Sequence, residues 1–316
     1  NNNLFNNKNI IKQNNNIDLP ILNIQIKNKH LNKIKSVRNK YKDKKILDKK
    51  DYYPAIIKNM NDVTPINIRI KGDWTSHIEL QKKMSFRILI KGENTFLGMR
   101  KFSIQHPRER KWLKEWLFTK ILHNNNILSP RISFIKVSIN DEHWGIYLLE
   151  ESFSKELLEF NKRRESVIVK MSEYFSWAIM KYSLKQDNIP PEHVHENIEM
   201  FDYNKYSKNK HFVNLYTVAK MKYQSALNRS EEFSKLFDTN KMAVYWALCD
   251  LFQAHHGCKT THNMRFYFNP LNSLLEPIHF DGDPGMTSGM VGDWKNNFLN
   301  SGTDYDFQRK YIHNLE

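Results

Sequence analysis

The strongest constraint on the fold is an alternation of apolar and polar residues that extends from Ile66 to Ile139. The alternating runs cover residues 66–70, 86–90, 102–104 and 135–139, and glycines stand at positions 72, 92 and 98 between them. A period of two places every second side chain on the same face of a strand, which is typical of half-buried strands in an antiparallel sheet. The sequence therefore predicts a largely antiparallel sheet in the first half of the chain.

One helical pattern interrupts this predicted sheet. Apolar residues recur every three or four positions from Trp112 to Ile121, before three consecutive asparagines and Pro130 end the pattern. Side chains at this spacing share one face of a helix. We therefore expect Trp112, Trp116 and Phe118 to lie in the core.

The second half of the chain is predicted to be mainly helical. A short apolar strand at residues 167–170 comes first, and helical patterns follow at residues 212–227 and 242–252. Asp238 is placed to cap the N-terminus of the last of these helices. A β-rich half thus precedes an α-rich half.

This order of elements predicts an α+β protein of two lobes with a cleft between them. Residues 1–17 include nine asparagines and predict a disordered lead-in. Residues 18–180 predict a β-rich N-terminal lobe, and residues 181–316 predict a mainly helical C-terminal lobe that carries the catalytic and metal-binding loops.

The charge balance favours anionic partners. The chain has 49 Lys and Arg residues against 34 Asp and Glu, which gives a formal net charge of +15. Because no nucleic-acid recognition motif accompanies this charge, we expect no specific binding of nucleic acid. No run of apolar residues is long enough to predict a membrane span.

The densest group of polar residues lies in the second half. It runs from Asp250 to Asn263 and is followed, after a predicted strand, by an acidic turn that contains Asp281 and Asp283. Amide and carboxylate oxygens are the hard ligands that Mg²⁺ prefers when it also binds phosphate. The sequence therefore predicts a magnesium site formed by Asn263, Asp281 and Asp283, and phosphoryl transfer as its chemistry.

Lys170 ends the short apolar strand of residues 167–170. A strand that ends on a lysine can hold an ammonium against nucleotide phosphates, with a glutamate to orient it. Glu150 or Glu151 is the expected glutamate.

A group of basic residues lies around the start of the first predicted helix. These residues could bind phosphate, although a solvated surface is the favoured interpretation. They are Lys101, His106, Arg108, Arg110 and Lys111.

Several short motifs occur in an order that resembles a known family. They are Tyr53-Pro54-Ala55 followed by the segment 66–72, then the segment 82–87 (KKMSFR), the segment 145–150 (GIYLLE), the segment 263–267 (NMRFY) and the segment 277–283 (PIHFDGD). In this order they resemble the CotH-type, spore-coat-associated atypical protein kinases, from about Leu19 onward.

The resemblance implies a divergent two-lobed protein-kinase-like fold that binds ATP with Mg²⁺ and phosphorylates serine on a protein substrate. It also implies that Lys170 binds phosphate, that Asn263 is a catalytic-loop amide, and that Asp281 binds metal. The family's name points to a spore coat, a cell surface or a secreted protein, and the sequence itself leaves the compartment open.

The chain departs from the family pattern at the catalytic-loop aspartate, where it has His255 and His256. Three interpretations follow. His256 could accept the hydroxyl proton, since an imidazole is a competent base near neutral pH. Asp250 could take this role from the end of the preceding helix. Alternatively, the protein has lost transfer activity and is a binding or surface-assembly protein.

A metal-dependent hydrolase is a further alternative. The same loop offers several possible zinc ligands: His255, His256, Cys258, His262 and His279. Their spacing matches none of the common zinc motifs. We therefore expect Mg²⁺ rather than Zn²⁺.

Overall fold

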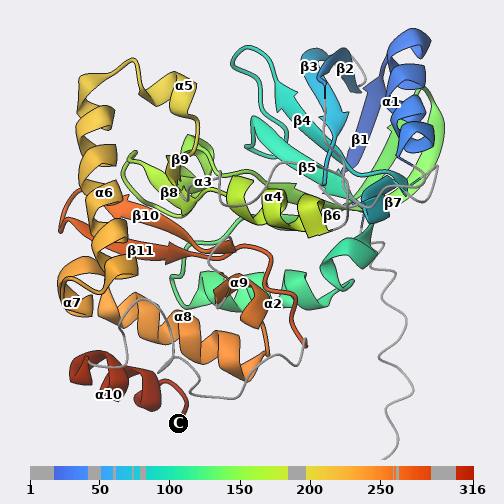
Figure 1. The fold of residues 1–316 in the computed structure, drawn as a ribbon. Helices are drawn as coiled ribbons and strands as arrows, with labels where there is room; N and C mark the ends of the chain where they lie inside the picture. The colour runs from blue at the N-terminus through green and yellow to red at the C-terminus, as the bar shows by residue number, and fades with distance from the viewer. Residues whose placement is uncertain are drawn as a thin grey trace, which may run out of the picture.

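Seven strands of the first half close into a barrel, as the computed structural model shows (Figure 1). The structure describes residues 18–41, 51–59, 62–72, 75–78, 83–183, 197–258, 260, 263–285 and 304–316. The barrel strands are β1 (Ile21–Gln25), β2 (Tyr53–Asn59), β3 (Asp62–Ile70), β4 (Phe86–Ile90), β5 (Lys101–Gln105), β6 (Ile132–Ile139) and β7 (Glu142–Glu151). They follow the order β1-β2-β3-β4-β5-β7-β6.

The barrel closes through a parallel pair between β1 and β6, with Ile21 opposite Lys136 and Ile24 opposite Ile139. All other neighbouring strands of the barrel are antiparallel. The alternation seen in the sequence places Ile66, Ile68 and Ile70 inside, where they are buried. Helix α1 (Asn28–Lys40) adds buried apolar side chains to the same core.

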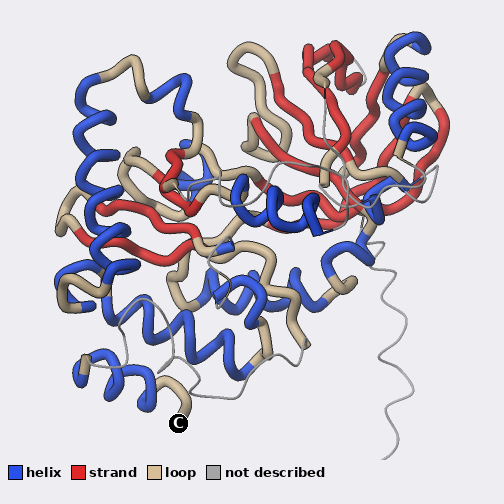
Figure 2. Tube along the Cα trace, in the orientation of Figure 1, coloured by secondary structure: helices blue, strands red, loops and turns tan. Residues whose placement is uncertain are grey.

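A second sheet of four strands has the order β11-β10-β8-β9. Its strands are β8 (Ile168–Met171), β9 (Ile198–Met200), β10 (Arg265–Asn269) and β11 (Leu274–Ile278). The helices of the remaining chain are α2 (Lys114–Asn124), α3 (Lys155–Phe160), α4 (Tyr174–Ser183), α5 (Tyr203–Tyr206), α6 (Lys210–Asn228), α7 (Phe233–Leu236), α8 (Thr239–Leu251), α9 (His255–Cys258) and α10 (Tyr305–His313), with short 3₁₀ turns η1 (Thr75–Ile78) and η3 (Pro107–Arg110). Figure 2 shows the separation between the strand-rich barrel and the more helical part.

Aromatic packing joins the second sheet to its helices. Phe266 of β10 lies 5.0 Å from Tyr223 of α6 and 5.1 Å from Phe237, measured between ring centroids. At the base of this core, Phe307 of α10 packs against Trp246 of α8 at 5.4 Å. These contacts explain why helices from distant parts of the chain assemble on one sheet.

The predicted α+β class is confirmed, and the predicted kinase-like two-lobed fold is wrong. The first seven strands form a closed mixed barrel, with a separate four-stranded sheet beside it. The physical reason is the pairing of β1 with β6, which turns the predicted open sheet into a barrel. β8, which lies within the predicted N-terminal lobe, pairs with β9 and β10 of the second sheet.

The helix predicted from Trp112 begins later, at Lys114, because Lys111 and Trp112 both have left-handed backbone angles. Trp112 is consequently 58% exposed, contrary to the prediction, whereas Phe118 is buried as expected. Asp238 caps α8, because its side chain accepts a hydrogen bond from the backbone N–H of Lys241 at 3.1 Å.

The predicted lead-in at residues 1–17 and the loop around Pro190 lie outside the described residues. No described helix has both the length and the apolar character that a membrane span requires.

Candidate functional site

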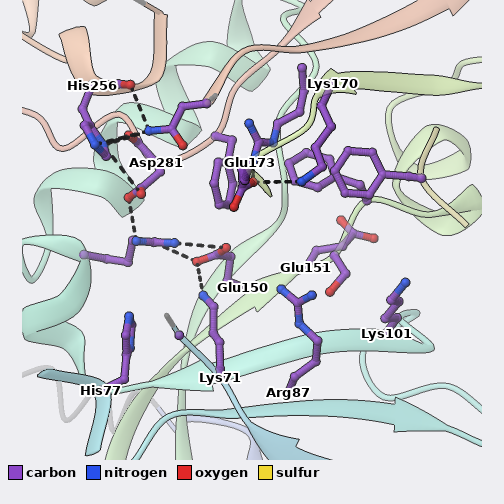
Figure 3. Close-up of a pocket in the computed structure, with 18 of the residues that line it drawn as sticks. Lys71, His77, Arg87, Lys101, Glu150, Glu151, Lys170, Glu173, His256 and Asp281 are labelled. Atoms are coloured by element: carbon purple, nitrogen blue, oxygen red, sulfur yellow. Dashed lines mark hydrogen bonds and ion pairs between the residues drawn. The ribbon is translucent and has the colours of Figure 1, made fainter. Parts of the chain in front are cut away.

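A cavity of about 450 Å³ lies where the outer face of the barrel meets the second sheet and the acidic turn (Figure 3). Its lining includes seven basic side chains, Arg69, Lys71, Arg87, Lys101, Arg110, Lys170 and Arg265, and four acidic ones, Glu150, Glu151, Glu173 and Asp281. A cavity of this size suits a small molecule. The excess of cations favours an anionic ligand.

The period of two explains why charged residues reach this cavity. On β3 and β4 the apolar side chains Ile68 and Ile88 point into the barrel, so the intervening Arg69 and Arg87 point outward. Arg69 is opposite Arg87 in the strand register, and both line the cavity. The same strands therefore supply the barrel core and one wall of the site.

On the barrel side, Glu150 of β7 joins two cations. Its Oε2 accepts hydrogen bonds from Lys71 Nζ at 3.2 Å and from Arg110 Nε at 2.8 Å. Gln105 contributes from β5, because its Nε2 donates to Glu150 Oε2 at 2.6 Å and its Oε1 accepts from Lys71 Nζ at 2.8 Å. We call Lys71, Glu150 and Arg110 the barrel triad.

Burial and charge shift the pKa values of this triad in ways that follow from its contacts. Burial lowers the pKa of Lys71 to about 8, and the attraction of Glu150 offsets part of that effect. Burial alone would raise the pKa of Glu150, but Arg110 and Lys71 outweigh it and hold the pKa well below its usual range. Glu150 is therefore ionised at neutral pH.

A matching group lies on the second-sheet side. Glu173 Oε1 accepts from Lys170 Nζ of β8 at 2.9 Å and from Arg265 Nη2 of β10 at 2.8 Å. Lys170 and Arg265 are opposite each other in the register of β8 and β10, which explains how one carboxylate reaches both. Although burial opposes ionisation of Glu173, Lys170 and Arg265 lower its pKa to about 2. We call these residues the sheet triad.

The acidic turn connects to the barrel triad through Arg110. Arg110 Nη1 donates to Asp281 Oδ1 at 2.6 Å, while Nε of the same guanidinium binds Glu150. Asp281, which the sequence predicts as a metal ligand, lines the cavity. Asp283 does not: its carboxylate lies 3.4 Å from Lys111 Nζ instead.

Glu115 of α2 holds the backbone of the acidic turn in place. Its carboxylate accepts hydrogen bonds from the backbone N–H groups of Gly282 and Asp283, each at 3.2 Å, and from His279 Nε2 at 2.8 Å. Burial opposes ionisation, yet His279 and Arg110 lower the pKa of Glu115. The charged carboxylate thereby holds the backbone from which Asp281 projects.

His256 and Asn263 complete the wall beside the acidic turn. His256 Nδ1 lies 2.9 Å from the carbonyl oxygen of Asp281, which can only accept, so this nitrogen carries the proton. Asn263 Nδ2 donates to the carbonyl oxygen of His256 at 3.1 Å. One cavity is therefore lined by five residues that the sequence predicted for the site: Glu150, Lys170, His256, Asn263 and Asp281. Glu150 and Asp281 lie far apart in the sequence.

Asp250 lies elsewhere. It is buried at the end of α8, where it pairs with His255 Nε2 at 2.8 Å and accepts a hydrogen bond from the hydroxyl of Tyr311. It connects α8 to α9 and α10 and does not line the cavity.

The possible zinc ligands are dispersed among different partners. His255 pairs with Asp250, His279 pairs with Glu115, and Cys258 is buried. Within the described part of the chain, no group of three or more His, Cys, Asp or Glu side chains could hold a metal ion. His262, another predicted candidate, lies outside the described residues.

Sequence reasoning missed Lys71 and Glu115 and undervalued Arg110. The signal for Lys71 was present, because the alternating run Ile66, Ile68 and Ile70 ends on this lysine just as the strand of residues 167–170 ends on Lys170. Arg110 belonged to a basic group for which a solvated surface was favoured. Glu115 carried no signal, since a single glutamate on a helix is most often exposed.

Comparison with known proteins gives one family. The model of the family described as "CotH kinase protein" matches residues 68–314. A search of curated proteins finds no match to the chain.

Proposed function

The chain belongs to the CotH kinase protein family, and from this premise we propose that it binds ATP with Mg²⁺ in the cavity and transfers the γ-phosphate to a serine hydroxyl of a protein. The observation that carries the proposal is the cavity itself. It brings together cations from two sheets with the carboxylate of Asp281 and the amide of Asn263. Phosphoryl transfer requires mainly positioning and charge neutralisation, and these are the groups that supply them.

The donor set supports a magnesium site that is completed by the nucleotide. Mg²⁺ commonly binds one or two protein oxygens and takes its remaining ligands from phosphates and water. Among the oxygen-bearing residues that line the cavity, we assign this role to Asp281 and Asn263, which lie beside each other around His256. They would hold the ion, which would offset the negative charge of the phosphates. Asp283, the third ligand predicted from the sequence, lies outside the cavity lining and is not included.

The cations of the two triads would hold the triphosphate. Lys71 and Arg110 approach from the barrel, whereas Lys170 and Arg265 approach from the second sheet. Because each pair shares a carboxylate, the side chains are oriented before the ligand arrives. Glu150 and Glu173 therefore act through the cations that they orient.

His256 is the residue we propose to accept the proton of the serine hydroxyl. Since Nδ1 donates to the Asp281 carbonyl, Nε2 carries the lone pair, and Asn263 Nδ2 lies 3.3 Å from it. The serine hydroxyl would replace Asn263 as the donor to Nε2. In the proposed step the serine oxygen bonds to the γ-phosphorus, the bond to the bridging β,γ-oxygen breaks, the hydroxyl proton passes to Nε2, and ADP leaves.

A second function is favoured by a different observation. The four carboxylates that line the cavity among the described residues each bind cations: Glu150 binds Lys71 and Arg110, Glu151 binds Arg131, Glu173 binds Lys170 and Arg265, and Asp281 binds Arg110. Asp250 is likewise committed to His255 and Tyr311. A nucleotide-binding protein without transfer activity would fit this arrangement.

The test combines binding with transfer. ATP affinity is measured by calorimetry with and without Mg²⁺ for the wild type, Asp281→Asn and Asp283→Asn, and transfer is followed with γ-labelled ATP and a serine-rich acceptor protein. We expect Asp281→Asn to remove the Mg²⁺ dependence of binding, and Asp283→Asn to change it less.

Unchanged Mg²⁺-dependent affinity in Asp281→Asn would exclude the metal role of Asp281. Binding of ATP by the wild type without labelling of any acceptor would favour the non-catalytic function. Loss of labelling in His256→Gln, with ATP affinity retained, is the result expected for a proton acceptor.

A further inference from the structure

We infer that Lys71, held by Glu150 and flanked by Arg110, is the principal phosphate-binding lysine of the cavity, ahead of Lys170. This inference rests on the proposed function and assigns a specific residue within it. The sequence motifs pointed to Lys170, and the family match, which covers both lysines, does not distinguish them. The structure distinguishes them by their burial, by their carboxylate partners and by their connection to Asp281.

The connection to Asp281 is the first argument. Arg110 donates to Asp281 Oδ1 at 2.6 Å and to Glu150 Oε2 at 2.8 Å, and that same Glu150 oxygen accepts from Lys71. Lys71 is therefore linked through one shared oxygen to the guanidinium that touches the proposed magnesium ligand. A phosphate that contacts Arg110 would therefore also lie close to Lys71.

The carboxylate partners give the second argument. Lys170 Nζ has two carboxylates within 4.0 Å, Glu173 at 2.9 Å and Glu199 at 3.9 Å. Among the described residues, Lys71 Nζ has only Glu150 within that distance, at 3.2 Å. Each lysine shares its nearer carboxylate with an arginine, Lys71 with Arg110 and Lys170 with Arg265, so the second carboxylate beside Lys170 makes the difference. The ammonium of Lys71 is thus the less neutralised of the two and gains more from a phosphate oxygen.

Burial gives the third argument. The Lys71 side chain is 8% exposed against 17% for Lys170. A buried ammonium has lost most of its hydration, as the lowered pKa of Lys71 also indicates. An anionic ligand therefore displaces little further water from Lys71 when it binds. Within the described part of the chain, Gln105 and Glu150 use two of its three donor positions, and the third is left for the ligand.

The backbone beside Lys71 is fixed as well. Gly72 has φ +95°, and a Cβ placed there would lie 2.0 Å from Cδ2 of His77. The imidazole is held in turn by Ser85, whose Oγ lies 2.9 Å from His77 Nδ1. The backbone N–H of Lys71 donates to the carbonyl oxygen of the same Ser85 at 2.8 Å, so Ser85 holds both the backbone of Lys71 and the neighbouring imidazole.

The experiment compares the two lysines in the same cavity. Calorimetry measures the Kd of Mg-ATP, and separately of inorganic tripolyphosphate, for the wild type, Lys71→Met and Lys170→Met. Loss of a charge-assisted contact corresponds to about 10- to 100-fold in Kd. We expect Lys71→Met to weaken both ligands by this factor, and Lys170→Met to weaken them by less than about threefold.

Each outcome decides between the proposals. An equal or larger loss in Lys170→Met would overturn the inference while leaving ATP binding intact. Wild-type protein that binds tripolyphosphate but not Mg-ATP would refute the proposed function. The ratio of the tripolyphosphate Kd values of Lys71→Met and Lys170→Met would still test the role of Lys71. Failure to bind either ligand would refute both.

A second pair of variants covers the case in which Lys71→Met does not fold. Lys71→Arg and Lys170→Arg keep the positive charges but change the donor geometry. Lys71→Arg should weaken tripolyphosphate at least threefold more than Lys170→Arg, by about 0.65 kcal/mol. Equal effects of the two arginine variants would count against the inference.

Discussion

Replacing Glu150 by glutamine tests how much the buried barrel triad contributes to stability. The change keeps the shape of the side chain but removes the negative charge that Lys71 and Arg110 face. Removing one partner of a buried ion pair costs about 3–5 kcal/mol. Two hydrogen bonds to charged donors, at about 1.5–3 kcal/mol each, lead to a similar figure. We therefore expect the free energy of unfolding at pH 7 to fall by about 4 kcal/mol.

The assay is urea unfolding, followed by tryptophan fluorescence and by far-ultraviolet circular dichroism. Glu93→Gln is the matched control, because Glu93 is 94% exposed and only approaches Arg100 at 3.5 Å. An exposed pair of this kind contributes about 0–1 kcal/mol. If Glu150→Gln cost no more than Glu93→Gln, with the same dependence on urea, the reasoning that Glu150 stabilises the two buried cations would be refuted.

Two further predictions use the same unfolding assay. Gly72→Ala should lower the free energy of unfolding by about 2–4 kcal/mol, because the new Cβ adds left-handed backbone strain and a clash with His77. Gly92→Ala is the control, since Gly92 has φ +75° and nothing within 4 Å of the added Cβ, and it should lower this free energy by about 1 kcal/mol. Equal losses would show that the His77 side chain moves aside. Glu173 has a pKa of about 2 in the folded protein against an ordinary value of 4.5, so its stabilisation is complete above pH 4.5 and is lost as the pH falls toward 2. The wild type should therefore lose more stability than Glu173→Gln over this interval, and parallel pH curves would contradict the prediction.

The elements of the fold that follow from local pattern were predictable from the sequence. Period-two alternation located β3, β4, β5 and β6, because one face of each strand is buried in the barrel. Asp238 marked the start of α8, because a cap is a local interaction. The closure of the barrel was not predictable, since the pairing of Ile24 with Ile139 joins residues far apart in the sequence. The local sequence pattern of a strand does not indicate which two edge strands of a sheet pair to close a barrel.

The site divides in the same way. The residue types of the polar segments identified His256, Asn263 and Asp281, and all three line the cavity. Asp250 has the same chemistry, but it faces the helical core and binds Tyr311. The direction in which a helix presents a carboxylate depends on what packs against that helix. For Asp250 this is α10, whose aromatic face the sequence motifs did not include.

The sequence predicted a lysine held by a glutamate, and it paired Lys170 with Glu150 or Glu151. The structure has two such lysine–glutamate pairs, with different partners. Glu150 was expected to orient a lysine, and Lys170 was expected to be held by a glutamate, because their segments follow one another in the sequence. In the structure the chain leaves the barrel after β7 and enters a second sheet at β8, so sequence neighbours become opposite walls of the cavity. Glu150 of β7 instead pairs with Lys71 at the end of β3, across β5 and β4, and Lys170 pairs with Glu173 three residues later. Strand order thus decides which charges meet, and the order of strands in a closed barrel is set by the packing of the whole core.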